Sequence, residues 1–164
     1  MSTRLSIAVC GPDPVPDGEV EARAEAVGRL IARAGAVLVC GGLGGVMEAS
    51  CRGAAAEGGL TVGILPDLDR RRANPYLTYS IPTGMGEMRN TLLVRAADAV
   101  IAVAGEFGTL SEIAFALKTG VPVVGMDTWE LAKAGGRSVE AFARATTPEE
   151  AVAEALRLAG ERVS

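Results

Sequence analysis

Two glycine-rich segments carry the residue types that could bind a negatively charged ligand. Residues 40–48 read Cys-Gly-Gly-Leu-Gly-Gly-Val-Met-Glu, and residues 105–112 read Gly-Glu-Phe-Gly-Thr-Leu-Ser-Glu. Each segment lies between an apolar run and a helical pattern. Glycine lets a ligand approach the backbone closely, and the N–H groups at a helix start attract anions. We therefore predict one pocket for a phosphate-bearing ligand, lined by Gly11, Gly41, Gly42, Gly44, Gly45, Thr83, Gly84, Asn90, Gly105, Gly108 and Thr109.

A purely structural interpretation of these segments stays open. A glycine turn can serve only as a tight connection between a strand and a helix. Thr109 and Glu112 also fit a capping box, in which the two side chains satisfy backbone N–H groups at the helix start. Two such turns in one small sheet favour a ligand site over two structural turns.

Arginines offer further candidates for contact with an anion. Residues 82–90 form a glycine-rich loop that leads into a helix carrying Arg89, and arginine is a good planar partner for phosphate or carboxylate. The alternatives are an Arg89–Glu112 ion pair or an Arg89 that faces solvent. The Arg70–Arg72 run could hold a ligand's negative end, although a solvated loop is the more common role of such a run.

The elements that must position these residues alternate along the chain. Continuous apolar runs predict strands covered on both faces at Leu5–Cys10, Ala36–Cys40, Leu60–Leu65, Ala99–Ala104 and Val121–Met126, with further candidates at Leu77–Ile81 and Val139–Ala143. The helices expected between them are one capped by Asp17 and ended by Gly35, then Gly45–Glu57, Glu87–Ala97, Leu110–Lys118, and one from Thr147 and Pro148 to Ala159 that stops at Gly160.

This alternation predicts an α/β fold and fixes where a ligand would bind. We expect a three-layer Rossmann-like open parallel sheet of about six to seven strands with helices on both faces, formed by residues 1–164 as a single nucleotide-binding domain. Ligands of such sheets bind beyond the carboxyl ends of the strands. The two glycine segments follow directly after two of those strand ends.

Composition excludes several other classes. The chain has 164 residues, no histidine, three cysteines and a net charge of −4. We expect the cysteines to be buried thiols and predict no metal site and no resident cofactor. The scattered basic residues predict no nucleic-acid or membrane partner. No apolar run approaches the roughly 18–20 residues that span a bilayer, so we expect a cytoplasmic protein.

Three motifs in this order resemble the LOG (LONELY GUY) family, once described as lysine-decarboxylase-like. That family carries GGGxxGLMG, M-x-x-R-K and PGGxGTxEE. Here Cys40–Glu48 matches the first motif, Met88–Asn90 part of the second, and Ala104–Glu112 the third. The similarity covers roughly residues 7–127 and is strongest to a subgroup of small bacterial proteins with GGLGGVME and GTLSE motifs.

The resemblance implies binding of a nucleoside 5′-monophosphate and two alternative functions. In LOG enzymes an Arg and a Glu, matching Arg89 and Glu112, act in a phosphoribohydrolase that cleaves the N-glycosidic bond. The alternative is a carrier that binds a phosphorylated pterin such as molybdenum cofactor without turnover. The resemblance also implies a homodimer or homotetramer, with a seam on helices Gly45–Glu57 and Leu110–Lys118 as one option. A third option is an oligomer with a vestigial site.

Several residues depart from the family motifs. They are Cys40, Glu48, Asn90, Ala104, Glu106 and Ser111. Glu48 and Glu106 add negative charge near the expected anion site. Two like charges about 4 Å apart repel by roughly 4 kcal/mol at an effective dielectric constant of 20. Glu106 would have to point away, bind a ribose hydroxyl or recruit a cation.

Overall fold

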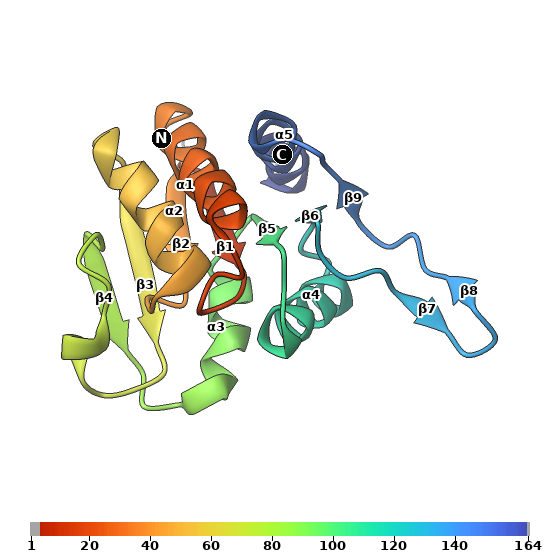
Figure 1. Cartoon of the computed structure of the whole chain (residues 1–164), viewed down its shortest axis with the longest axis horizontal. Helices are drawn as coiled ribbons and strands as arrows, with labels where there is room; N and C mark the ends of the chain where they lie inside the picture. Colours follow the sequence, from red (N-terminus) through yellow and green to blue (C-terminus); the bar gives the residue numbers. More distant parts are fainter. Residues whose placement is uncertain (1–3, 164) are drawn as a thin grey trace.

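The continuous apolar runs form the strands of one parallel sheet. A computed structural model describes residues 4–163 and has seven parallel strands in the order β4-β3-β2-β1-β5-β6-β9 (Figure 1). Their bounds are β1 Ser6–Cys10, β2 Val37–Cys40, β3 Thr61–Leu65, β4 Tyr79–Pro82, β5 Ala99–Val103, β6 Val123–Met126 and β9 Ala143–Arg144. Ile7 of β1 pairs with Leu38 on one side and Ala99 on the other. The predicted α/β class and strand number are confirmed.

Helices cover both faces of this sheet. Helices α1 (Gly18–Arg33), α2 (Gly45–Ala56) and α5 (Pro148–Val163) pack on one face, and α3 (Asn90–Arg95) and α4 (Phe107–Thr119) on the other (Figure 1). Short 3-10 turns lie at Arg70–Arg72 and Gly86–Arg89. The sequence did not indicate the small hairpin of β7 (Ala132–Lys133) and β8 (Arg137–Ser138), which projects from the body.

Local capping signals explain some helix ends and mislead at others. The Asp17 carboxylate accepts the N–H groups of Glu19 and Val20 at 2.9 Å, as predicted for the cap of α1. Helix α5 does not stop at Gly160 but continues to Val163. The segment predicted as helix Glu87–Ala97 is a 3-10 turn followed by α3, and only Ala143 of the predicted strand Val139–Ala143 is in a strand.

The start of α4 changes the interpretation of the second glycine segment. The helix begins at Phe107, three residues earlier than predicted, so Thr109 and Glu112 lie inside it. The alternative interpretation of Thr109 and Glu112 as a capping box is therefore wrong, because both residues are past the helix start. Their side chains are available for another role.

Strand order determines where the site lies. The chain leaves β1 toward β2 on one side and later returns to β5 on its other side, so the direction of the sheet reverses between β1 and β5. Ligands of open α/β sheets bind at such a switch point, outside the carboxyl ends of the strands. Cys10 ends β1 here and Gly11 follows it, while Ala104 and Gly105 follow β5.

Candidate functional site

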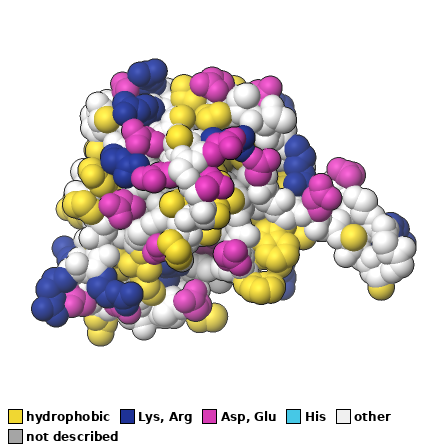
Figure 2. All heavy atoms as spheres, in the orientation of Figure 1, with side chains coloured by type: hydrophobic (Ala, Val, Ile, Leu, Met, Phe, Trp, Pro, Cys, Tyr) yellow, Lys and Arg dark blue, Asp and Glu magenta, His cyan; other side chains and the backbone are white. Residues whose placement is uncertain are grey.

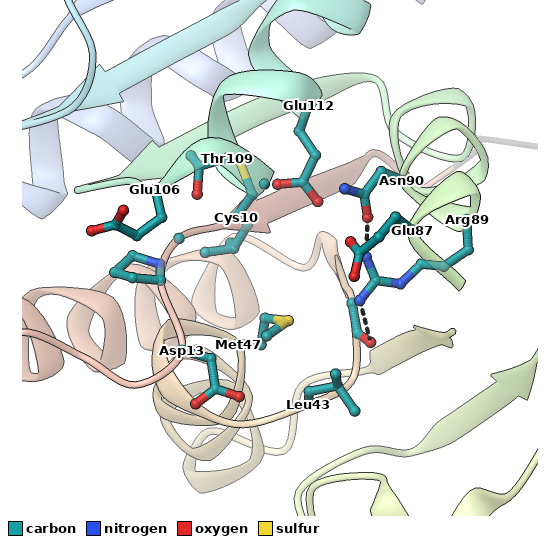
Figure 3. Close-up of a pocket in the computed structure, with 15 residues that line it drawn as sticks. Cys10, Asp13, Leu43, Met47, Glu87, Arg89, Asn90, Glu106, Thr109 and Glu112 are labelled. Carbon is teal, nitrogen blue, oxygen red and sulfur yellow. Dashed lines mark hydrogen bonds between the residues drawn. The ribbon is translucent and has the colours of Figure 1, made fainter. Parts of the chain in front are cut away.

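A cavity of about 300 Å³ opens at this switch point (Figure 3). Seven residues expected at the site line it: Gly11, Gly41, Arg89, Asn90, Gly108, Thr109 and Glu112. They directly follow β1 and β2, or come from the end of the 3-10 turn, the start of α3 and the helix α4. The fold thus brings parts of all three motifs to one place.

The remaining predicted residues lie elsewhere. Gly42, Gly44, Gly45, Thr83, Gly84 and Gly105 do not line the cavity. The Thr83 hydroxyl donates to the carbonyl of Leu65 at 2.7 Å, so it is used within its own loop. Gly105 borders a neighbouring cavity of about 620 Å³.

We call the first glycine segment, residues 41–46, the α2 turn. Several of its backbone N–H groups already donate to acceptors within the protein. The Gly44 N–H donates to the Asp13 carboxylate at 3.2 Å, and the Val46 N–H donates to the carbonyl of Pro12 at 3.0 Å. The Gly42 N–H lies 3.3 Å from the Cys40 sulfur. An internal carboxylate therefore occupies the anion position that the sequence predicted for a ligand.

The second segment, residues 105–109, which we call the α4 turn, faces the cavity. Its N-cap residue Glu106 makes no side-chain cap hydrogen bond, and the first intrahelical bond is from the Leu110 N–H to the Glu106 carbonyl. The N–H groups of the first helical residues, which include Gly108 and Thr109, have no partner within a helix. Thr109 is a buried residue that lines the cavity, and its hydroxyl makes no hydrogen bond with residues 4–163. This turn has the chemistry of an anion site.

Arg89 is held at the opposite wall by polar contacts. Its side chain is 7% exposed, one terminal nitrogen donates to Asn90 Oδ1, and the other lies 3.4 Å from the Gly41 carbonyl (Figure 3). Asn90 Nδ2 in turn donates to Ser111 Oγ of α4 at 3.3 Å. Two departures from the family motifs, Asn90 and Ser111, thus brace the arginine against α4.

Glu112 and Arg89 do not form the ion pair considered above. The ion pairs of residues 4–163 include none between them. Burial raises the pKa of Glu112 to about 7, against an opposing effect of the Arg89 charge. The Cys10 thiol, whose own pKa is raised by burial and by Glu112, is its near neighbour. Glu112 therefore changes charge near neutral pH.

Acidic groups outnumber basic ones around the cavity. Asp13, Glu87, Glu106 and Glu112 line it together with Arg89. The Glu106 carboxylate lies across the cavity from Arg89 and points away from it (Figure 3). Glu48 borders a different cavity beside Arg52 and does not add its charge here.

Two residues that the sequence analysis did not propose have clear roles at the site. Asp13 fills the α2 turn, and Met47 forms part of the apolar wall. The signal for Asp13 was present, because Gly11-Pro12-Asp13 directly follows the first strand at the switch point. Its partner, Gly44, lies 31 residues away, so only the packed fold reveals the contact.

The Arg70–Arg72 run lies in a solvated loop and the cysteines are buried thiols, as the sequence analysis favoured. Arg71 and Arg72 pair with Asp69 and Asp67 in an exposed loop away from the cavity. All three cysteines are buried and unpaired by disulfides. Cys40 and Cys51 lie with their sulfurs 3.4 Å apart.

Charged side chains of both signs share one face of the described protein (Figure 2). On the face shown in Figure 2, acidic and basic side chains are interspersed rather than gathered into a basic track. Within residues 4–163, every helix is too short or too polar to cross a membrane. The same residues contain no group of three or more Cys, Asp or Glu placed to hold a metal ion.

The fold and the site together define a Rossmann-like protein with a ligand cavity at its switch point. The sequence profile of the SLOG cluster4 family matches residues 4–152, and the chain belongs to that family. A protein of Archaeoglobus fulgidus, described only as uncharacterized, is 45% identical over 136 residues, which is 83% of this chain and 85% of that protein. Membership in the wider LOG-like superfamily agrees with the motif resemblance.

Solved structures of molybdenum cofactor proteins are similar to this chain. The molybdenum cofactor binding protein of Rippkaea orientalis is 32% identical, with a TM-score of 0.85 and complete coverage of both chains. The molybdenum cofactor carrier protein of Chlamydomonas reinhardtii is 29% identical, with a TM-score of 0.84 over 96% of this chain and 99% of that one.

Proposed function

We propose that this protein binds a phosphorylated pterin of the molybdenum cofactor type in the switch-point cavity and releases it unchanged. The observation that carries the proposal is the α4 turn, with its uncapped helix start and unused Thr109 hydroxyl on a cavity. The similarity to carrier and binding proteins for this cofactor supports the choice of ligand over a nucleotide substrate.

The residues present fit a single phosphate ester. The N–H groups of Gly108 and Thr109 and the Thr109 hydroxyl would hold its oxygens. Arg89, whose buried Nε has no partner in the described chain, supplies the positive charge of the cavity. A second phosphate at the α2 turn would have to displace the Asp13 carboxylate. We therefore expect one anionic group per ligand.

Native mass spectrometry of the purified protein tests the proposal. We expect a retained phosphorylated pterin, or uptake of added neopterin monophosphate that is recovered intact. Thr109→Val should weaken uptake at least about tenfold, because a hydrogen bond to a charged group contributes about 1.5–3 kcal/mol. Failure of the wild-type protein to take up any phosphate ester would refute the proposed function.

Hydrolysis of a nucleoside monophosphate is a second candidate, favoured by one observation. Arg89 and Glu112 line the same cavity, and Glu112, with its pKa of about 7, could act as a general acid or base in N-glycosidic cleavage. The assay is release of free base from AMP and related nucleotides. If wild-type protein and an Arg89→Ala/Glu112→Ala double variant release equally little, this candidate is excluded.

We also propose a homodimer or homotetramer, but with a subunit interface that does not use helix α2. Helix α2 places its apolar residues in the core against α1, so it has no apolar face left to offer. Large apolar side chains are exposed instead on the segments that also carry cavity residues, at Met85, Met88, Leu92 and Phe107. Sedimentation analysis of wild type and Met88→Asp would test this seam. A cytoplasmic location also stays a prediction.

A further inference from the structure

The buried carboxyl group of Glu112 has few hydrogen-bond partners within the described protein. Its side chain is 7% exposed and forms no ion pair within residues 4–163. The Cys10 thiol donates a hydrogen bond to it, and the positive charge of Arg89 acts on it from the same cavity. Buried carboxylates in folded proteins normally accept several hydrogen bonds. Since Glu112 lines the cavity, a bound ligand is the natural source of the missing donors.

The other wall of the cavity is suited to a flat ring. Leu43 and Met47 lie across from Glu112, and Val9 completes an apolar lining (Figure 3). A methionine side chain adapts to a ring face and contacts it favourably. A sugar diol also binds carboxylates, but it gains little from such an apolar wall. Small-molecule sites combine apolar walls of this kind with a few polar groups that fix the ligand's orientation.

We propose that Glu112 recognises two adjacent N–H donors on the ligand's heterocycle, as on the 2-amino-4-oxopyrimidine ring that pterins and guanine share. This inference rests on the proposed function, because it assigns the ring end of the same phosphorylated ligand. A carboxylate accepts both donors of such a ring at once. Adenine presents one donor beside one acceptor, so it leaves one carboxylate oxygen unpaired.

The protonation state of Glu112 strengthens this discrimination. A carboxylate matches the donor–donor edge, whereas the protonated acid, with one donor and one acceptor, matches adenine. The groups that face Glu112 are Cys10 from β1, and Arg89 and Glu87 from the 3-10 turn; Asp13 and Glu106 line the same cavity. In the ligand-free protein Glu112 titrates near pH 7. The preference for a guanine-like edge should therefore increase from pH 6 to pH 8.

Calorimetric titration with GMP, AMP and ribose 5-phosphate tests this inference. At pH 8, wild-type protein should bind GMP at least about fivefold more tightly than AMP, since a bidentate pair of hydrogen bonds discriminates against the wrong base by about five- to 150-fold. The ratio of the two affinities should fall at pH 6. Because GMP and AMP carry the same phosphate, titration of that phosphate affects both affinities equally and does not change the ratio. Glu112→Gln should bring the ratio close to one at both pH values. The matched control Glu48→Gln, an acid that borders a different cavity, should keep the wild-type ratio and its pH dependence.

The possible outcomes separate this inference from the proposed function. If GMP and AMP bind equally well to wild type, the ring assignment is overturned while phosphate binding stands. If Glu112→Gln weakens ribose 5-phosphate as much as GMP, the carboxyl binds the sugar and the assignment is again overturned. If none of the three phosphate esters binds, the proposed function fails, and this inference fails with it.

Discussion

The α2 turn and the α4 turn resemble each other in sequence, yet only one is open to a ligand. Both leave a strand through glycines and begin a helix, and both have N-cap residues without a side-chain cap. At the α2 turn, Asp13 and Pro12 accept the N–H groups of Gly44 and Val46. At the α4 turn, Gly108 and Thr109 line the cavity.

The difference comes from a segment distant in sequence. The chain after β1, at Pro12 and Asp13, crosses the start of α2 and supplies an internal anion there. It also lines the cavity that the α4 turn faces. The α2 turn therefore has a structural role beneath the site, whereas the amide groups of the α4 turn are available to a ligand. A glycine motif by itself does not distinguish these roles.

Substituting alanine for one glycine in each turn should give the largest difference in stability between the two turns. Gly45 has φ of +62°, and a Cβ there would lie 2.2 Å from the Pro12 carbonyl oxygen. We expect Gly45→Ala to lower the free energy of unfolding by about 3 kcal/mol or more, from strain and overlap together. A Cβ on Gly108 meets no atom within 4 Å, so Gly108→Ala should unfold like wild type. Urea denaturation of both variants measures the contrast. Equal stability of the two would contradict the structural role of the α2 turn.

Neutralising Glu112 should stabilise the protein above neutral pH. Its pKa is about 7 in the folded chain and ordinarily 4.5, so the folded state binds the proton more tightly. The cost of its charge is therefore absent below pH 4.5, develops between pH 4.5 and 7, and is complete above pH 7. Glu112→Gln should raise the unfolding free energy at pH 8 by about 3 kcal/mol, with a much smaller gain at pH 4.5. A gain that is the same at both pH values would show that Glu112 is not charged when buried.

Glu112 and Asp13 illustrate what sequence patterns can and cannot predict. The strands were predictable because the continuous apolar runs Leu5–Cys10 and Ala99–Ala104 reflect burial on both faces of a sheet. The position of Glu112 on the cavity was foreseen only through a motif. Its local pattern indicated a capping box, and the register of α4 removed that possibility. The occupation of the α2 turn by Asp13 depends on packing between distant segments, which no local pattern contains.

Removing the Thr109 hydroxyl should separate binding from stability. The hydroxyl has no hydrogen-bond partner within residues 4–163, and valine has the same shape. Thr109→Val should leave the unfolding free energy within about 0.5 kcal/mol of wild type but weaken binding of neopterin monophosphate at least about tenfold. Matched denaturation and calorimetry give both quantities. A loss of stability without a loss of affinity would assign Thr109 to the fold rather than to the site.

Asp13→Asn should give the smallest changes. It should lower stability at the α2 turn and raise affinity for a phosphate ester at the α4 turn. The α2 turn loses a charged acceptor at a helix start, which should cost about 1 kcal/mol of stability. The cavity loses one negative charge, so affinity for a phosphate ester should rise two- to fivefold at low salt. Tighter binding that persists unchanged in 1 M salt would contradict this electrostatic explanation.

Amide chemical shifts during a titration test most directly which turn binds the phosphate. In ¹⁵N-labelled protein, neopterin monophosphate should shift the amide resonances of Gly108 and Thr109 strongly, as their N–H groups gain an anionic acceptor. The resonances of Gly44 and Val46 should change little, because Asp13 and Pro12 already accept their hydrogen bonds. Large shifts at Gly44 and Val46 with little change at Gly108 and Thr109 would contradict the account.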